Sequence, residues 1–237
     1  MKDADLLYRY MDYERFVKIV NENKLTLANP FKDWDDLHEG FICRLHKKHG
    51  EEFLKKYAKE NNIDIDMADL ILSHIRFNMR AQSWSKSQDC AAMWAAYGYE
   101  KKAIMVGVQR QAIEELTYNG HPVKVVDIVY EKDLTVEKEL KKIFTRDLHA
   151  ETEKVLEIKR DCFSYENEVR IIKELYGSLD REGDSDILAI PPASSFIKNV
   201  LIHPKADNDF CDAVRNFCKD HNILNVMRST LLDEPML

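Results

Sequence analysis

The spacing of hydrophobic and polar residues predicts that the chain opens with a strand, a helix and a second strand. Residues 6–10 (LLYRY) form a short apolar and aromatic run, as expected of a strand. Phe16, Ile19 and Val20 then recur at helical spacing, and residues 25–30 (LTLANP) predict a strand that ends at a proline. The acidic, turn-rich segment 31–41 (FKDWDDLHEGF) suits a loop beside a cleft.

The rest of the pattern predicts an α+β fold with a mixed or antiparallel β-sheet. Between about 50 and 80, apolar residues fall three and four positions apart, which predicts two helices in a helical insert. The links between strands are hairpin-like or irregular and do not form regular strand–helix–strand units. With no repeat and no Pro/Gly/Ser-rich linker, residues 1–237 are expected to form a single domain. Further strands are predicted at 81–87, 102–108, 123–130, 163–173, 186–192, 197–204 and 225–232, and further helices at 89–98, 133–160 and 210–221.

Composition narrows the possible functions. The formal net charge of −7 predicts neither general nucleic-acid binding nor attraction to an anionic membrane. No apolar run approaches the ~20 residues of a membrane helix, and the first ten residues lack a signal-peptide pattern, so we expect a cytoplasmic protein that does not bind membranes. The five cysteines are widely spaced and predict no disulfide framework or zinc site. The phosphate-binding glycine motifs are absent, and His46 and His49 are interpreted as a solvated turn, so no metal site is expected.

Three short segments carry candidate chemistry. In residues 163–172 (FSYENEVRII), Glu166, Glu168 and Arg170 occupy alternate positions, so on a strand they would share one face. Two ionised carboxylates on one face repel each other, so three explanations are open: both are solvated, they pair with a cation such as Arg170 or Lys173, or they serve a catalytic function. Ser83 and Ser85 flank Trp84 in an extended segment, which is typical either of a ligand-facing pair of hydroxyls or of a plain edge strand.

Arg9 is the third candidate. An arginine within a buried strand is costly unless an anion or a set of acceptors meets it. The alternative is that Arg9 points outward while Tyr8 and Tyr10 point inward.

The order of these segments resembles the Arg-Ser-Glu class of ADP-ribosyltransferases, at Arg9, Ser83/Ser85 and Glu166/Glu168. Nearly the whole chain also resembles a bacterial family described as a domain of unknown function, DUF2971. That resemblance rests on the stretches LYRYMD, KLTLANPFKDWDDLHEGF, SWSKS, MWAAYG, AIMVGV, VVDIVY and KRDCFSYENEVRII. The resemblance to the ADP-ribosyltransferase superfamily implies a split β-sandwich of that type with flanking helices, and NAD as a substrate. It also implies an unknown protein or nucleic-acid acceptor, with water as the acceptor in NAD hydrolysis, and a role such as a toxin or phage-defence effector.

The resemblance implies specific roles. Glu168 would stabilise the positive charge that develops on the ribose when nicotinamide leaves, and Glu166 would orient or deprotonate the acceptor. Arg9 would bind a phosphate or ribose oxygen of NAD, and Ser85, with Ser83, would hold the nicotinamide ribose.

Two aromatic residues extend this implied site. Trp94 and Tyr97 lie three apart in a predicted helix and would wall the nicotinamide pocket, or else pack in the core.

The chain departs from the superfamily pattern, and two other functions stay open. Trp84 stands where the central threonine of Ser-Thr-Ser is usual, and Arg170 is placed to neutralise Glu168. A non-catalytic binding module would retain the cleft with Glu168 closed by an ion pair to Arg170 or a lysine, and would have no measurable affinity for NAD. A metal-dependent nuclease would use Glu166 and Glu168 with Lys173.

Overall fold

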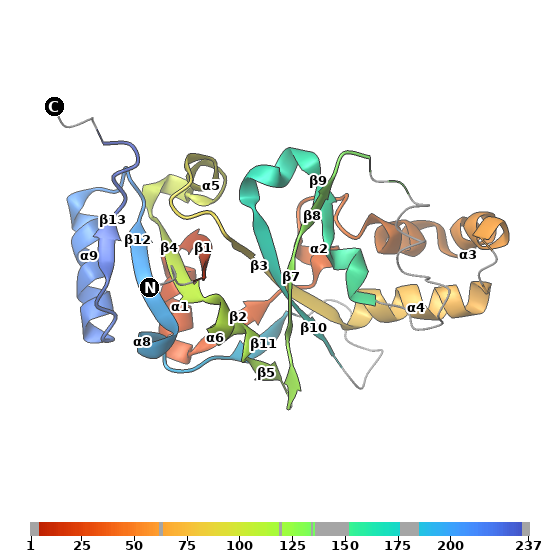
Figure 1. Ribbon diagram of the computed structural model, residues 1–237, viewed down its shortest axis with the longest axis horizontal. Coiled ribbons are helices and arrows are strands. Elements are labelled where there is room, and N and C mark those ends of the chain that lie inside the picture. Colours follow the sequence, from red (N-terminus) through yellow and green to blue (C-terminus); the bar gives the residue numbers. More distant parts are fainter. Residues whose placement is uncertain are drawn as a thin grey trace.

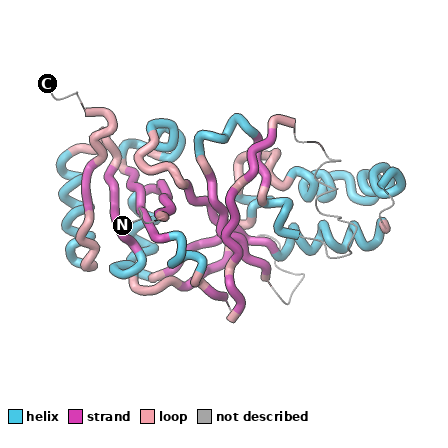
Figure 2. The backbone as a smooth tube through the Cα atoms, viewed as in Figure 1, coloured by secondary structure: helices cyan, strands magenta, loops and turns pink. Residues whose placement is uncertain are grey.

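A computed structural model describes residues 5–61, 64–118, 120–133, 135, 152–175 and 185–233. Figures 1 and 2 show helices flanking a large sheet, with a pair of helices extending at one end. The predicted α+β class with a mixed sheet is confirmed.

Seven strands of the described residues form the main sheet, in the order β13-β12-β4-β1-β3-β10-β7. The β12–β13 pair is parallel, and the other neighbouring pairs in this sheet are antiparallel. These strands are β1 (Leu6–Asp12), β3 (Met79–Ser85), β4 (Ala103–Gln109), β7 (Lys124–Asp127), β10 (Glu168–Glu174), β12 (Ile197–Ile202) and β13 (Val226–Arg228).

The sheet divides between β1 and β3. Along its whole length β1 pairs with β4, and β3 pairs with β10 over seven residues, but β1 and β3 share only the register pair Tyr8↔Ser85. Beside this division, β2 (Lys24–Leu27) pairs with β11 (Asp186–Ala189) and adjoins β3 through a bridge between Ala28 and Ala81. The two halves of the sheet therefore separate beyond Tyr8, which leaves room between them.

Helices cover both faces of the half that contains β1. On one face, α1 (Tyr13–Glu22) and α9 (Asn208–Asp220) pack together, with the Phe16 and Phe217 ring centroids 5.7 Å apart. Asp12 and Asp207 cap the amino ends of these helices by accepting backbone N–H hydrogen bonds. On the other face, α5 (Ala91–Tyr97) packs against β1.

The helices predicted near residues 50–80 are present, and the first of them begins earlier than expected. They are α3 (Phe41–Asn61), which is interrupted at Gly50 (φ 55°, ψ −138°), and α4 (Ile65–Asn78). Their apolar faces form a second core with β3 and β10. That they are an insert within a single domain stays a prediction.

The prediction of a charged helix over 133–160 is wrong at its carboxyl end, residues 152–160, which the structure describes. Residues 152–156 form a 3₁₀ helix, η2, followed by β9 (Ile158–Arg160), while residue 134 and residues 136–151 lie outside the described residues. The strand predicted over 123–130 is divided by Ile128 into β7 and β8 (Val129–Glu131). The remaining elements are α2 (Pro30–Asp33), η1 (Tyr99–Lys101), α6 (Arg110–Glu114), β5 (Thr117–Tyr118), β6 (His121–Pro122), η3 (Asp161–Glu166) and α8 (Ala193–Phe196).

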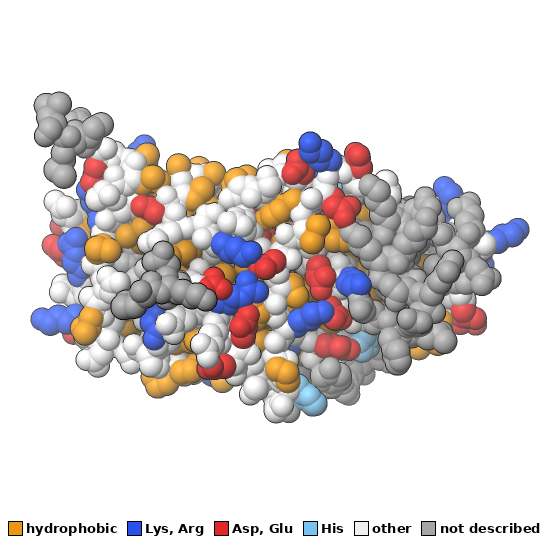
Figure 3. Space-filling model, in the orientation of Figure 1, with side chains coloured by type: hydrophobic (Ala, Val, Ile, Leu, Met, Phe, Trp, Pro, Cys, Tyr) orange, Lys and Arg blue, Asp and Glu red, His pale blue; other side chains and the backbone are white. Residues whose placement is uncertain are grey.

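Two further observations concern membrane-spanning helices and surface charge. Within the described ranges, no helix combines the length and apolar character needed to cross a bilayer. On the face drawn in Figure 3, basic and acidic side chains are interspersed and do not gather by sign.

Candidate functional site

A cavity of about 1060 Å³ lies where β1 and β3 separate. Its walls come from β1, β2, β3, β9, β10, β11, α1, α5, η3 and the segment 33–39. Six of the seven site residues predicted from the sequence line it, and the seventh, Trp94, does not: the lining includes Arg9, Ser83, Ser85, Tyr97, Glu166 and Glu168. Segments far apart in the chain are thus brought together at one site.

Arg9 crosses the gap between the two halves of the sheet. Tyr8 and Tyr10 are buried on the opposite face of β1, and the Nη1 atom of Arg9 donates a hydrogen bond to the carbonyl oxygen of Ser83. Burial, with the nearby charge of Arg15, lowers the pKa of Arg9 to about 10, so the side chain is a cation at neutral pH. No carboxylate of the described residues forms an ion pair with Arg9, and an anionic ligand would therefore be stabilised beside it.

The two serines occupy one face of β3 and help to hold the carboxylates. The β3–β10 register pairs Ser85 with Glu168, and the nearby Ser83 hydroxyl helps to lower the pKa of the Glu168 carboxyl. The Ser85 hydroxyl donates to the carbonyl oxygen of Glu166 at 2.6 Å and accepts from a backbone N–H. Trp84 is buried in the main core. In this structure both hydroxyls support the neighbouring acidic residues.

Glu166 and Glu168 do not lie on one strand, so this part of the sequence prediction is wrong. Strand β10 begins at Glu168, whereas Glu166 is the last residue of η3. Asn167 between them adopts the left-handed conformation (φ 45°, ψ 53°), which asparagine tolerates well. The alternation holds for Glu168 and Arg170, and Glu166 reaches the cavity from a turn.

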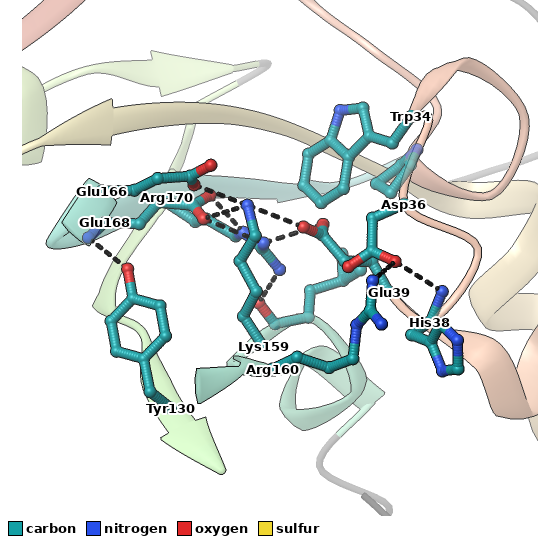
Figure 4. Close-up of polar contacts among 12 residues, drawn as sticks. Trp34, Asp36, His38, Glu39, Tyr130, Lys159, Arg160, Glu166, Glu168 and Arg170 are labelled. Atoms are coloured by element: carbon teal, nitrogen blue, oxygen red, sulfur yellow. Dashed lines mark hydrogen bonds and ion pairs between the residues drawn. The ribbon is translucent and has the colours of Figure 1, made fainter. Parts of the chain in front are cut away.

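The carboxylates belong to a buried cluster of five charged side chains (Figure 4). Arg170 Nε lies 2.6 Å from Glu168 Oε1, and Arg170 Nη2 lies 2.8 Å from Glu39 Oε2. The Lys159 ammonium lies 2.6 Å from Glu166 Oε2, 2.9 Å from Glu39 Oε1 and 3.2 Å from Glu168 Oε2. All five are buried. Three carboxylates and two cations leave one formal negative charge on the cluster.

The two neighbouring glutamates differ in proton affinity. Burial alone would raise the pKa of Glu168, but the charges of Arg170 and Lys159 outweigh burial and lower the pKa to about 2. For Glu166, burial prevails over the attraction of Lys159, and its pKa is raised. Such a separation is typical of a site where one carboxylate stays ionised and the other exchanges a proton.

Sequence reasoning missed the residues that complete this cluster. Glu39 belongs to the segment 31–41, which was predicted to lie beside a cleft, and residues 33–39 of that segment line the cavity. The ring of Trp34 lies 4.4 Å from the Arg170 guanidinium, and Asp36 pairs with Arg160 at 2.9 Å. Three side chains of this segment thus attach it to β9 and β10 (Figure 4). The acidic run itself was the available signal, although nothing in it distinguishes Glu39.

The two aromatic candidates have different surroundings. Tyr97 is partly exposed, lines the cavity and donates its hydroxyl hydrogen bond to Glu166 Oε1 at 3.2 Å. Burial and the charge of Glu166 raise the pKa of Tyr97. Trp94 instead packs edge-on against Tyr10, with ring centroids 4.8 Å apart, and its Nε1 donates to Asp89. The interpretation of Trp94 as a pocket wall is therefore corrected to core packing.

The arrangement does not provide the groups that a metal-dependent nuclease would use. Lys173 is an odd number of positions from Glu168 along β10, so it projects from the opposite face, where it pairs with Asp186. Within the described part of the chain, no group of three His, Cys, Asp or Glu side chains is placed to hold a metal ion. The three carboxylates surround the Lys159 ammonium instead.

His46, which was expected in a solvated turn, is another correction. It is buried, and its Nε2 lies 2.8 Å from Asp69 Oδ1.

Comparison with known proteins gives a family match and a set of structural neighbours. The model of a family described as "Protein of unknown function (DUF2971)" matches residues 93–171, about a third of the chain, and confirms the resemblance there. A search of curated proteins gave no match. Among solved structures, DarT of Thermus sp. 2.9 in complex with NAD⁺ is similar at 8% identity and a TM-score of 0.41, with 96% of each chain covered. The same protein in complex with ADP-ribosylated ssDNA gives 9% identity and a TM-score of 0.40, covering 96% of this chain and 95% of that one. This similarity is too distant to transfer a role to any residue.

Proposed function

We propose that this protein binds NAD in the cavity between β1 and β3 and cleaves the bond between nicotinamide and ribose, transferring ADP-ribose to an acceptor. The observation that carries the proposal is the convergence of Arg9, the Ser83/Ser85 pair and the Glu166/Glu168 pair on that one cavity. A cavity of about 1060 Å³ is large enough for a ligand of this class.

The distribution of charge around the cavity suits a molecule with two unlike ends. The side formed by β1, α1 and β2 contributes several cations, together with Glu22, and the side formed by η3, β10 and Glu39 contributes the buried carboxylates. NAD carries a negatively charged pyrophosphate and a positively charged nicotinamide ring. Its phosphates would bind near Arg9 and its nicotinamide ribose near Glu168. The cations that line the cavity on the first side are Arg9, Arg15, Lys18 and Lys24.

The proposed chemistry assigns a separate role to each glutamate. As the nicotinamide leaves with the bonding electron pair, positive charge develops on the ribose, and the ionised Glu168 stabilises it. The acceptor then forms a bond to the ribose carbon and gives up a proton. Glu166, with its raised pKa, would accept that proton, and Tyr97 would help to orient it.

A specific observation also supports a second candidate function, a module that binds NAD without cleaving it. Both oxygens of Glu168 accept hydrogen bonds from Arg170, at 2.6 and 3.1 Å, which reduces the field that this carboxylate exerts on a ligand. Under this alternative, NAD binds at Arg9 and is not cleaved. The two candidates differ only in turnover, so one assay separates them.

The test is nicotinamide release from NAD, with and without added protein or single-stranded DNA as acceptor. Wild type is expected to release nicotinamide, and Glu168→Gln is expected to be slower by roughly 100-fold or more, the scale of a lost electrostatic contact to the transition state. Glu114→Gln is the matched control, because Glu114 pairs with Arg110 at the surface outside the cavity lining, and it should retain full activity. NAD binding without release would favour the non-catalytic module. Absence of both binding and release would contradict the proposal.

A further inference from the structure

Lys159 occupies the centre of the buried cluster although it lies outside the three segments singled out in the sequence. It comes from β9, its side chain is 8% exposed, and its ammonium contacts Glu39, Glu166 and Glu168 within 3.2 Å. An ammonium group has three N–H donors, so these three carboxylates account for all of them. The side chain is therefore committed to one position.

Of its three carboxylate partners, Glu166 depends most on the positive charge of Lys159. Arg170 contacts Glu168 and Glu39, so each of these has a second cation. Among the described residues, Lys159 is the one cation that forms an ion pair with Glu166. Tyr97, which also contacts the Glu166 carboxylate, is neutral at physiological pH.

We propose that Lys159 is a positioning residue that holds Glu166 beside Glu168 and keeps Glu166 ionised, ready to accept a proton from the acceptor. This inference deepens the proposed function and rests on it. It assigns to Lys159 a role that neither the sequence motifs nor the comparisons supply.

The physical reason is repulsion among like charges in a region that excludes water. Without Lys159, Arg170 would be the remaining cation of the five-residue cluster, and the three buried carboxylates would leave two formal negative charges. A proton would relieve this excess most easily at Glu166, which has no direct contact with Arg170 and whose pKa is already raised by burial. A protonated Glu166 cannot act as a base. The groups that face Glu166 from the surrounding elements are Glu39, Tyr97, Tyr130, Lys159, Tyr165, Glu168 and Arg170.

The first test compares Lys159→Met with Lys159→Arg in the nicotinamide-release assay across pH. Lys159→Met is expected to lower kcat roughly tenfold or more at neutral pH, to change KM less, and to move the acidic limb of the pH profile to higher pH. Lys159→Arg retains the positive charge and should restore the wild-type position of that limb. The matched control is Lys124→Met, because Lys124 also bridges two glutamates, Glu153 and Glu157, outside the cavity lining. Its pH profile should be unchanged.

The second test does not need activity and so separates this inference from the proposed function. NMR titration of the Glu166 side-chain carboxyl carbon, assigned with Glu166→Gln, should give a higher pKa in Lys159→Met than in wild type. If Lys159→Met does not fold, Lys159→Gln removes the charge and retains a hydrogen-bond donor, with the same shift expected. An unchanged Glu166 titration, or an unchanged acidic limb in an active enzyme, would overturn the role of Lys159. A wild type that neither binds nor cleaves NAD overturns the proposed function whatever the titration gives.

Discussion

Replacing Arg170 with methionine should destabilise the protein far more than the loss of a surface ion pair. Arg170 is fully buried, and its guanidinium contacts Glu168, Glu39 and the carbonyl oxygen of Leu156. Removing one partner of a buried pair costs about 3–5 kcal/mol, because the other partner is left as an uncompensated charge. For a chain of this size, each kcal/mol lowers the melting temperature by about 2–4 °C, so a fall of roughly 6–20 °C is expected.

The assay is thermal and urea unfolding, with Arg215→Met as the matched control. Arg215 forms an exposed pair with Asp212 at 2.9 Å, and such pairs contribute about 0–1 kcal/mol. If the two variants lose equal stability, or if Arg170→Met is as stable as wild type, the buried cluster does not have the strength inferred from its geometry.

The same variant should change the dependence of stability on pH. The pKa of Glu168 is lowered from 4.5 to about 2, so the folded state binds this proton more weakly than the unfolded state does. The contribution of Glu168 is therefore complete above about pH 4.5, and is lost as pH falls toward 2. Arg170→Met removes the charge that contributes most to lowering the pKa of Glu168. The increase in the free energy of unfolding from pH 3 to pH 5 should therefore be smaller in this variant than in wild type. An identical slope in both proteins would refute this reasoning.

Two further predictions concern the packing and the cysteines. Gly40 has a φ of +58°, and a Cβ added there would lie 2.4 Å from the Phe31 ring, so Gly40→Ala should cost more than the roughly 1 kcal/mol of left-handed strain alone. The control is Gly120→Ala, at φ +79°, where an added Cβ meets no heavy atom of the described residues within 4 Å beyond its chain neighbours. Equal melting temperatures for the two variants would contradict the packing around Gly40. Cys162 is exposed, whereas Cys218 is buried, and burial raises the pKa of Cys218 to about 12. Mass spectrometry after brief alkylation at pH 8 should therefore find Cys162 modified first. Earlier modification of Cys218 would be inconsistent with its burial.

The sequence was sufficient to predict the main elements and the meeting of three segments. The apolar run of β1 and the helical spacing of Phe16 and Val20 are local signals, and the structure retains them. The convergence at the cavity followed from the order of Arg9, Ser83/Ser85 and Glu166/Glu168, which depends on the family resemblance and not on periodicity.

The cluster around Lys159 could not be predicted in the same way. Glu39 and Lys159 lie in charged segments where a solvated side chain is the usual outcome, and their burial depends on contacts across 120 positions of the chain. The prediction for Glu166 was wrong because period-two alternation was extended through Asn167, whose left-handed conformation ends η3 before the strand begins. The first miss arises from tertiary contacts that local patterns do not encode, and the second from a local turn that an assumed period of two does not detect.

Calorimetric titration of NAD tests the central claim, that the cavity between β1 and β3 binds this dinucleotide through Arg9. Wild type is expected to bind NAD, and Arg9→Gln should bind at least about tenfold more weakly, since a hydrogen bond to a charged group contributes roughly 1.5–3 kcal/mol. Arg110→Gln, at a surface ion pair outside the cavity lining, should bind as wild type does. Equal affinity of wild type and Arg9→Gln, or no binding by any of the three proteins, would contradict the account.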